Sequence, residues 1–223
     1  MALHRAVRVG LPKARFTVVL LLQLATLFLL VALDTGRSMS RLIELTGVII
    51  PLSAIAVATD RKRERRTAFA LAAVAIAFNG SELSGFKLLQ LDVGPILSVL
   101  FSAYTTWLLL GGVVRSPRVT GDVLAGALAS YIMAGLAFAV VYGVIETRVP
   151  GAFTAPGLNP AAFPDLVYFS FVTLLTIGFG DVTPAAPLAR AVALFEGIFG
   201  VIFTTVVMAA LVAGYLRHRE GRA

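Results

Sequence analysis

The sequence predicts an all-α membrane protein with six transmembrane helices and a re-entrant helix and loop between the fifth and the sixth. Hydrophobic residues make up 58% of the 223 residues and charged residues only 14%, a balance that does not suit a soluble surface. Several apolar runs reach or approach the roughly 20 residues that a helix needs to cross a hydrocarbon core of about 30 Å. Backbone groups in lipid must form hydrogen bonds within their own segment, which favours helices.

The first run, 16–33, follows a basic tail at residues 1–15, and two interpretations of it are open. A secretory signal peptide also begins with basic residues and an apolar core. A retained helix is favoured, because the run is long for such a core and no small-residue cleavage site follows it. The second run, 42–59, contains Pro51, which predicts a kink of the kind that membrane helices tolerate.

The third run, 67–78, is the shortest, and as a helix it would be only about 18 Å long. It follows a basic cluster at residues 61–66. We still expect it to span the membrane, with Arg65 and Arg66 reaching the headgroups or with local thinning of the bilayer. Without this span, either the basic cluster would lie outside the cell or the loop before the last run would lie in the cytoplasm.

The fourth and fifth runs, 93–114 and 123–145, each have the length of a full span. A proline-rich stretch at 147–164 then predicts a surface loop, and the apolar segment 165–175 is too short to cross. The last run, 187–216, would be about 45 Å long as a helix, so it is expected to tilt or to extend beyond the bilayer.

The basic residues set the expected orientation, because loops rich in Lys and Arg face the cytoplasm. With the amino terminus inside, 14 of the 19 Lys and Arg residues fall on the inner side and 5 on the outer side. The sequence therefore predicts a multi-pass protein of the plasma or inner membrane with both termini in the cytoplasm. The expected parts are a cytoplasmic tail (1–15), a four-helix membrane domain (16–114), a cytoplasmic linker (115–122), a second membrane domain (123–216) and a cytoplasmic tail (217–223).

In a soluble protein, the net charge of +7 would suggest a nucleic-acid partner. Here the basic residues lie between apolar runs and no nucleic-acid recognition module accompanies them, so the expected partner is the lipid bilayer and not nucleic acid. The chain has no cysteine, which excludes disulfides and thiol chemistry.

The segment after the short apolar stretch carries a distinctive motif, Thr173-Leu174-Leu175-Thr176-Ile177-Gly178-Phe179-Gly180-Asp181. It resembles the signature of the potassium channel pore family, Thr-x-x-Thr-x-Gly-Tyr/Phe-Gly-Asp, and matches it at six positions. By this resemblance, 123–216 is a pore domain that consists of an outer helix, the pore helix 165–175, the filter and an inner helix. Pro164 and Asp165 suit the first turn of the pore helix. The resemblance implies a potassium-selective channel that conducts passively, with no enzymatic step and no cofactor apart from the permeant ion.

A potassium ion that crosses lipid must exchange its hydration shell for protein oxygens, and a strand along a pore axis can supply backbone carbonyls. The resemblance assigns this coordination to the carbonyls of Thr176, Ile177, Gly178 and Phe179, with the Thr176 hydroxyl at the inner end. Gly178 and Gly180 permit the positive φ angles that are needed when all carbonyls point to one side. One chain holds one such filter, so four identical chains are expected around the axis as a homotetramer.

The residues around the filter are expected to support it. By the resemblance, Tyr168 and Phe169 occupy aromatic positions that brace the filter from behind, and Thr173 belongs to the matched motif. A hydrogen bond from Tyr168 to Asp181 and packing alone are both open. Asp181 is expected at the outer mouth, where it would raise the local cation concentration and anchor the loop. Phe179 stands where tyrosine is more usual in the family, and this removes a hydroxyl that would tie the filter to its surroundings.

The last run contains candidates for a hinge and a gate. Gly200 falls where the family often has a hinge and Gly197 offers a second flexible point, but close packing through small residues is the other interpretation for both. Glu196 is a charged residue inside a span, and a structural hydrogen bond behind the pore is favoured over a role in gating. The residues expected to line the cavity and the inner gate are Val201, Thr204, Met208 and Val212.

The six-span layout is similar to that of voltage-gated potassium channels, whose fourth span carries Arg or Lys at every third position. The run 93–114 contains neither residue, so gating by that mechanism is not expected. Three alternatives to a selective channel are open: a poorly selective cation channel, a membrane sensor or assembly subunit with a silent pore, and a potassium uptake subunit. The intact motif argues against the first, and the single motif per chain argues against the third.

Overall fold

The computed structural model describes residues 15–32, 66–67, 69–70, 73, 93–116, 119–155, 162–207, 209–210 and 212–214. The described helices are α1 (Arg15–Ala32), α4 (Val93–Val114), α5 (Gly121–Arg148), α6 (Phe163–Leu174) and α7 (Pro187–Ile202). Helix α7 continues into the π-helical turn η1 (Phe203–Val207). Two short strands, β1 (Phe153–Thr154) and β2 (Thr183–Pro184), complete the described elements.

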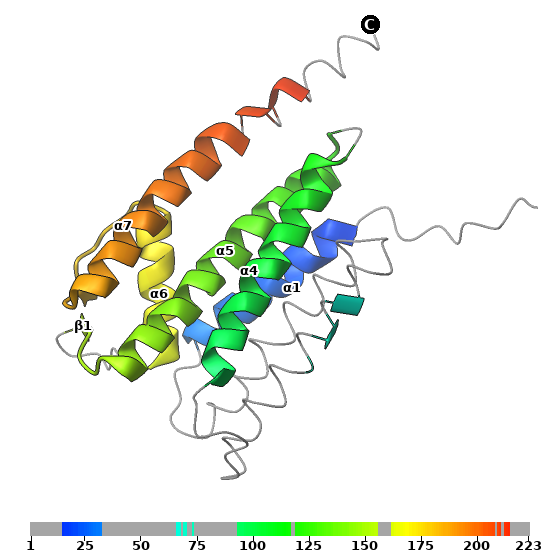
Figure 1. Ribbon diagram of the computed structural model, residues 1–223. Helices are drawn as coiled ribbons and strands as arrows, with labels where there is room; N and C mark the ends of the chain where they lie inside the picture. The colour runs from blue at the N-terminus through cyan, green and yellow to red at the C-terminus, as the bar shows by residue number, and fades with distance from the viewer. Residues whose placement is uncertain are drawn as a thin grey trace, which may run out of the picture.

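Helix α5 lies at the centre of the bundle (Figure 1). It packs against α4, α1 and α6, and α6 lies between α5 and α7. Two glycines allow this close packing: a Cβ at Gly126 would lie 2.9 Å from Phe16 of α1 and from Val113 of α4. A Cβ at Gly135 would lie 2.9 Å from Phe171 of α6. Small residues at such contacts bring membrane helices close together.

The helix boundaries follow the expected runs closely. Helix α4 has the expected limits, and α1 is displaced by one residue from the expected 16–33. Helix α5 extends beyond the expected run at both ends. It begins at Gly121 because Thr120 caps the first turn by accepting a hydrogen bond from the amide of Val123. Helix α6 begins two residues before the expected 165, and Pro164 and Asp165 occupy its first turn as predicted.

Part of the expected topology lies outside the described residues. The run 42–59 and residues 1–14 and 217–223 belong there, and of the run 67–78 only four residues are described, all of them helical. Among the described residues, two helical stretches are long and apolar enough to cross a membrane: α5, and Pro187–Gly214, which includes α7 and η1. The described part of the chain is therefore mostly helical, with two candidate spans.

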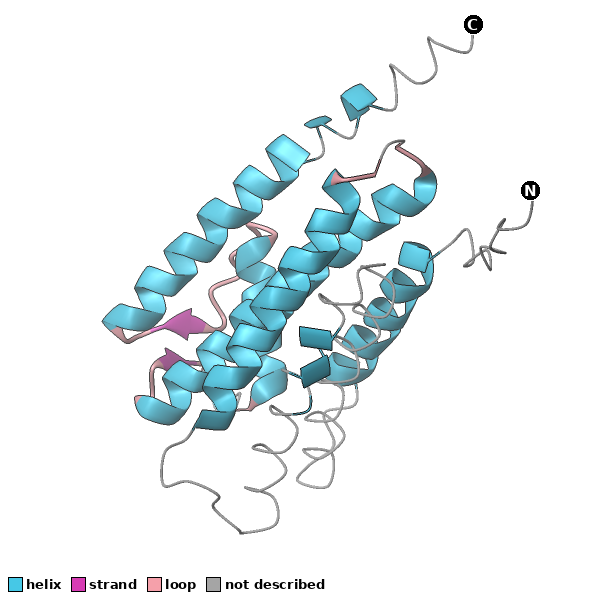
Figure 2. Ribbon diagram, turned by 45° about the vertical axis from the view of Figure 1, so that its right-hand side comes forward, coloured by secondary structure: helices cyan, strands magenta, loops and turns pink. Residues whose placement is uncertain are grey.

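The sequence predicts no strand, and here the all-α expectation needs a correction, because β1 and β2 form a short antiparallel pair. Phe153 pairs with Pro184, and Thr154 pairs with Thr183. Figure 2 shows the two strands at the end of the bundle where α5 ends and α7 begins. Two residues per strand are too few to give an alternating pattern, and Pro184 has no N–H with which to extend the ladder. The pair ties the loop after α5 to the segment that precedes α7.

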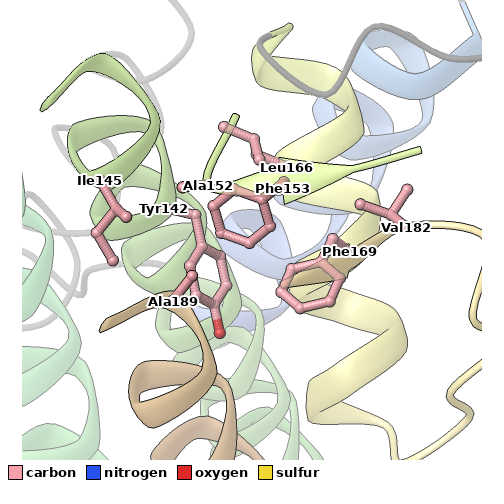
Figure 3. Close-up of a cluster of buried hydrophobic side chains, with 8 residues drawn as sticks. All are labelled: Tyr142, Ile145, Ala152, Phe153, Leu166, Phe169, Val182 and Ala189. Atoms are coloured by element: carbon pink, nitrogen blue, oxygen red, sulfur yellow. The ribbon is translucent and has the colours of Figure 1, made fainter. Parts of the chain in front are cut away.

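A buried hydrophobic cluster lies beside this strand pair (Figure 3). The rings of Tyr142, Phe153 and Phe169 meet edge to face, with centroids 5.2 Å, 5.1 Å and 5.3 Å apart. This geometry is favourable for aromatic pairs, and the three rings come from α5, β1 and α6. Phe169 therefore packs against α5 and β1. The other members are Ile145, Ala152, Leu166, Val182 and Ala189.

Two contacts join the first half of the chain to the second at the beginning of α5. The backbone amide and the hydroxyl of Thr17 both donate to Oδ1 of Asp122, at 2.9 Å each. A carboxylate at the first turn of α1 is favourable because the N-terminus of a helix is partially positive. The connection from α4 to α5 lies against the end of the stretch Pro187–Gly214, since a Cβ at Gly214 would lie 2.7 Å from Cγ2 of Val119.

Candidate ion pore

Helix α6 carries the motif at its C-terminal end. The amide of Leu175 donates to the carbonyl of Phe171 at 3.0 Å and closes the helix. Residues 175–176 form a turn, residues 177–179 have no regular secondary structure, and the chain bends at 180–182 before it enters β2. The segment is therefore held by α6 before it and by the strand pair after it.

Three consecutive amides of this segment donate back to the last turn of α6. The amide of Thr176 donates to the carbonyl of Thr173 at 2.9 Å. The amides of Ile177 and Gly178 both donate to the carbonyl of Val172, at 2.9 Å and 3.4 Å. In a trans peptide the N–H and the C=O point in opposite directions. The carbonyls of the three preceding residues, Leu175, Thr176 and Ile177, therefore point away from α6.

Positive φ angles alternate along the segment, with 56° at Thr176, 64° at Gly178 and 79° at Gly180. The two glycines have the conformation that the sequence predicts, and no atom lies within 4 Å of a Cβ built on either of them. Backbone conformation, and not lack of space, thus favours glycine there. Thr176 was not expected in this region, which is uncommon for a residue with a side chain and costs of order 1–3 kcal/mol. Such strain concentrates at functional sites.

The described chain leaves the motif and one face of α7 uncovered. The side chains of Ile177 and Phe179 are 49% and 67% exposed. On α7, Leu194, Phe195 and Ile198 are also exposed. Large apolar side chains gathered in this way mark a surface that contacts lipid or another chain.

The hydrogen bond that the sequence left open is present at the end of the motif. The hydroxyl of Tyr168 donates to Oδ2 of Asp181 at 2.6 Å, and the amide of Val182 donates to Oδ1 at 3.0 Å. The bond from Tyr168 holds the pKa of Asp181 below its ordinary value. The carboxylate is therefore negative at neutral pH, and this anchor is lost only as the pH falls through that lowered value.

We expect Tyr168→Phe to loosen the segment after the motif, because the ring of α6 is kept and only the anchor of Asp181 is removed. Hydrogen–deuterium exchange of the amides at 177–183 should become faster than in the unmodified protein. Tyr104→Phe is the matched control, since it removes a tyrosine hydroxyl that bonds to Thr67 and not to the motif. Equal exchange at 177–183 in both variants would contradict the anchoring role.

Glu196 of α7 is fully buried where α5, α6 and α7 meet. It forms hydrogen bonds there, in line with the structural role that the sequence analysis favours for it. Tyr142 of α5 donates to its Oε2, and Oγ of Ser170 of α6 lies 2.5 Å from its Oε1. All three side chains are 0% exposed. Sequence reasoning identified Glu196 and missed its two partners. The available signal was chemical, because a tyrosine or serine hydroxyl within an apolar segment needs a hydrogen-bond partner.

The end of α6 is enclosed by α5 and α7. Tyr131 of α5, which sequence reasoning also missed, donates to the carbonyl of Leu174 at 2.7 Å. A Cβ at Gly200 would lie 2.4 Å from that same carbonyl oxygen, whereas one at Gly197 would meet nothing within 4 Å. The structure therefore supports close packing at Gly200, and whether either glycine is a hinge stays a prediction.

One turn beyond Gly200, the inner helix widens into the π-helical turn η1, which the sequence did not predict. The hydroxyl of Thr204 donates to the carbonyl of Gly200 at 2.9 Å, and such bonding of threonine to the preceding turn can bend a helix. The π-turns within α-helices often occur at functional sites. Val201, Thr204 and Val212 are exposed in the single chain, and Met208 lies outside the residues whose side chains are described.

Comparisons with known proteins agree with this geometry. A family described as "Ion channel" matches residues 128–215, which include α6, the motif and α7. The chain is 32% identical over 90 residues to "Two pore potassium channel c" of Oryza sativa subsp. japonica, a match that covers 40% of this chain and 19% of that protein. It is 30% identical over 95 residues to the "Inward rectifier potassium channel Kirbac3.1" of Paramagnetospirillum magnetotacticum, covering 41% of this chain and 29% of the relative.

A third relative is matched over most of its length. This is "Protein LctB" of Bacillus caldotenax, 30% identical over 123 residues, which are 52% of this chain and 89% of that protein. No solved structure matches the chain. The matched family and the two named channels are ion channels and not enzymes. Motif, backbone geometry and relatives agree, and the chain belongs to the potassium channel pore family.

Proposed function

We propose that this chain is one subunit of a homotetrameric, potassium-selective channel and that residues 176–181 are its filter. The observation that carries the proposal is the backbone of the motif. The amides of residues 176–178 bond to α6, so the carbonyls of residues 175–177 point away from it. Positive φ recurs at Thr176, Gly178 and Gly180. A row of backbone oxygens on one side of a strand can replace the hydration shell of potassium.

In this proposal, the carbonyls of Thr176, Ile177, Gly178 and Phe179 coordinate the permeant potassium ions, and the Thr176 hydroxyl forms the innermost ring. A single chain supplies one column of oxygens, which cannot surround an ion. Four copies around a symmetry axis close the ring. Neighbouring subunits would also cover Ile177, Phe179 and the apolar face of α7, which a single chain leaves exposed. The ion is the cargo, and conduction needs no cofactor and no chemical step.

We also propose the six-span topology, with α6 as a re-entrant pore helix and both termini in the cytoplasm of the plasma or inner membrane. The lengths of α5 and of Pro187–Gly214 support two of these spans, and the distribution of Lys and Arg supports the orientation. Helix α4 carries no charged residue, so we infer that the channel does not use arginine-based voltage sensing.

The proposed function is tested by ion flux from the purified full chain in liposomes under a potassium gradient. Potassium flux that exceeds sodium flux severalfold and is blocked by barium is the expected result. Native mass spectrometry of the same sample should give four copies of the chain. Equal sodium and potassium flux would contradict selectivity. Intact tetramers without flux at any voltage would favour a silent sensor or assembly subunit.

A further inference from the structure

The structure buries two glutamates among its described residues, and their hydrogen-bond partners differ in kind. Glu146 of α5 is 8% exposed and accepts from two backbone amides, Gly151 to Oε1 at 2.9 Å and Phe153 to Oε2 at 3.1 Å. Both partners can only donate. This arrangement suits a group whose two oxygens both accept, which is a carboxylate.

Glu196 faces a different set of partners. Tyr142 donates to Oε2, and Oγ of Ser170 lies 2.5 Å from Oε1. The same Oγ lies 2.7 Å from the backbone carbonyl oxygen of Gly135. A serine hydroxyl carries one proton and a carbonyl carries none. One proton on Ser170 therefore cannot serve both of its close contacts.

The proton count is balanced if Glu196 supplies the missing proton. Ser170 then donates to the carbonyl of Gly135, Glu196 donates from Oε1 to Ser170, and Tyr142 donates to Oε2. With a charged Glu196, one of the two contacts of Ser170 would instead hold two acceptors together without a proton in a dry site.

The surroundings favour a neutral acid as well. Among the described residues, the titratable groups that face Glu196 come from α5 and are Tyr142 and Tyr131, and the hydroxyl of Tyr131 donates to the carbonyl of Leu174. The neighbour from α6 is the hydroxyl of Ser170. None of these groups is a cation that would compensate a buried negative charge, and such a charge is costly in the interior of a membrane protein.

We propose that Glu196 holds a proton as a neutral carboxylic acid and that the resulting chain of hydrogen bonds, Tyr142 to Glu196 to Ser170 to Gly135, positions the pore helix. Ser170 lies two and three residues before Val172 and Thr173, whose carbonyls accept from amides of the motif. A displacement of Ser170 is therefore passed to the row of carbonyls. Glu196 is a positioning residue that does not touch the ion.

The protonation state is tested by infrared spectroscopy of the full chain at neutral pH. The unmodified protein should show the carbonyl stretch of a buried carboxylic acid that is missing in Glu196→Gln. Glu146→Gln is the matched control and should keep that band, because Glu146 is bonded as a carboxylate. A spectrum of Glu196→Gln without any loss in this region would overturn the proposal. This measurement does not depend on conduction.

The positioning role is tested by thermal unfolding and by potassium selectivity of Glu196→Gln and Glu196→Ala. Glutamine keeps an acceptor for Tyr142 and a donor for Ser170, so we expect selectivity and melting temperature close to those of the unmodified protein. Alanine should lower the melting temperature by several degrees and reduce selectivity severalfold. Glutamine as damaging as alanine, or alanine without effect, would overturn the role.

The pH dependence adds a readout that simple packing would not change. If Glu196 is protonated in the folded state and ionised in the unfolded state, the folded state binds one proton more. The free energy of unfolding then decreases as the pH rises, until Glu196 also loses its proton in the folded state. The fall should be absent in Glu196→Gln, and an identical alkaline fall in both proteins would overturn the proposal. The selectivity measurement rests on the proposed channel function. If the unmodified protein does not conduct, that function fails, while the spectra and the unfolding curves still decide the state of Glu196.

Discussion

Replacement of Gly178 by alanine abolishes potassium conduction and leaves the tetramer assembled; this is the result that we expect. Gly178 has φ of 64°, and a residue with a Cβ costs about 1–2 kcal/mol in that region. No atom lies within 4 Å of the added methyl, so the cost arises in the backbone and stays local. The peptide on either side of Gly178 would rotate to relieve it, and the neighbouring carbonyl would leave the row. The change occurs in all four subunits.

The measurement is flux from liposomes, with assembly followed by native mass spectrometry. Gly121→Ala is the control, because Gly121 is helical and a Cβ there also meets nothing within 4 Å. We expect flux through Gly121→Ala at the level of the unmodified protein. Normal potassium flux and selectivity in Gly178→Ala would show that the filter has been assigned to the wrong residues.

The second large effect is expected at Gly200, where alanine should destabilise the protein although it favours helices. The added Cβ would lie 2.4 Å from the carbonyl oxygen of Leu174, so α7 or the end of α6 must move. Overpacking of this kind costs about 1–3 kcal/mol, which exceeds the gain of up to about 1 kcal/mol in helix propensity. Because Tyr131 donates to the same carbonyl, a displacement of the end of α6 also disturbs this hydrogen bond.

Gly197→Ala is the matched comparison, three residues earlier on the same helix. A Cβ at Gly197 meets nothing within 4 Å, so we expect this variant to be as stable as the unmodified protein or slightly more stable. Thermal unfolding in detergent gives the melting temperatures of Gly200→Ala and Gly197→Ala. Equal melting temperatures for the two variants would contradict close packing at Gly200. A conduction defect in Gly197→Ala with normal stability would support the hinge interpretation at Gly197.

The local features were predictable because short-range chemistry decides them. Helix α4 has the limits that its apolar run predicts, and α6 starts near Pro164 because proline suits a first helical turn. The positive φ angles at Gly178 and Gly180 follow from the same kind of argument, since only glycine adopts them at little cost. The residue type of Thr176 does not predict a positive φ. Its strained conformation depends on the hydrogen bonds from its own amide and from the amide of Ile177 to carbonyls of α6.

The sequence by itself indicated the lipid environment, the described helices and the motif. Hydropathy, helix length and backbone preference are properties of residues that are neighbours in the sequence. Only the tertiary structure decided which groups meet across helices. Tyr142 lies 54 residues before Glu196 and Ser170 lies 26 residues before it, yet the three close one buried network. The pairing of β1 with β2 and the contact between Gly200 and Leu174 are decided in the same way. A periodic pattern shows that a residue faces a neighbour, but which neighbour it meets depends on how the helices pack.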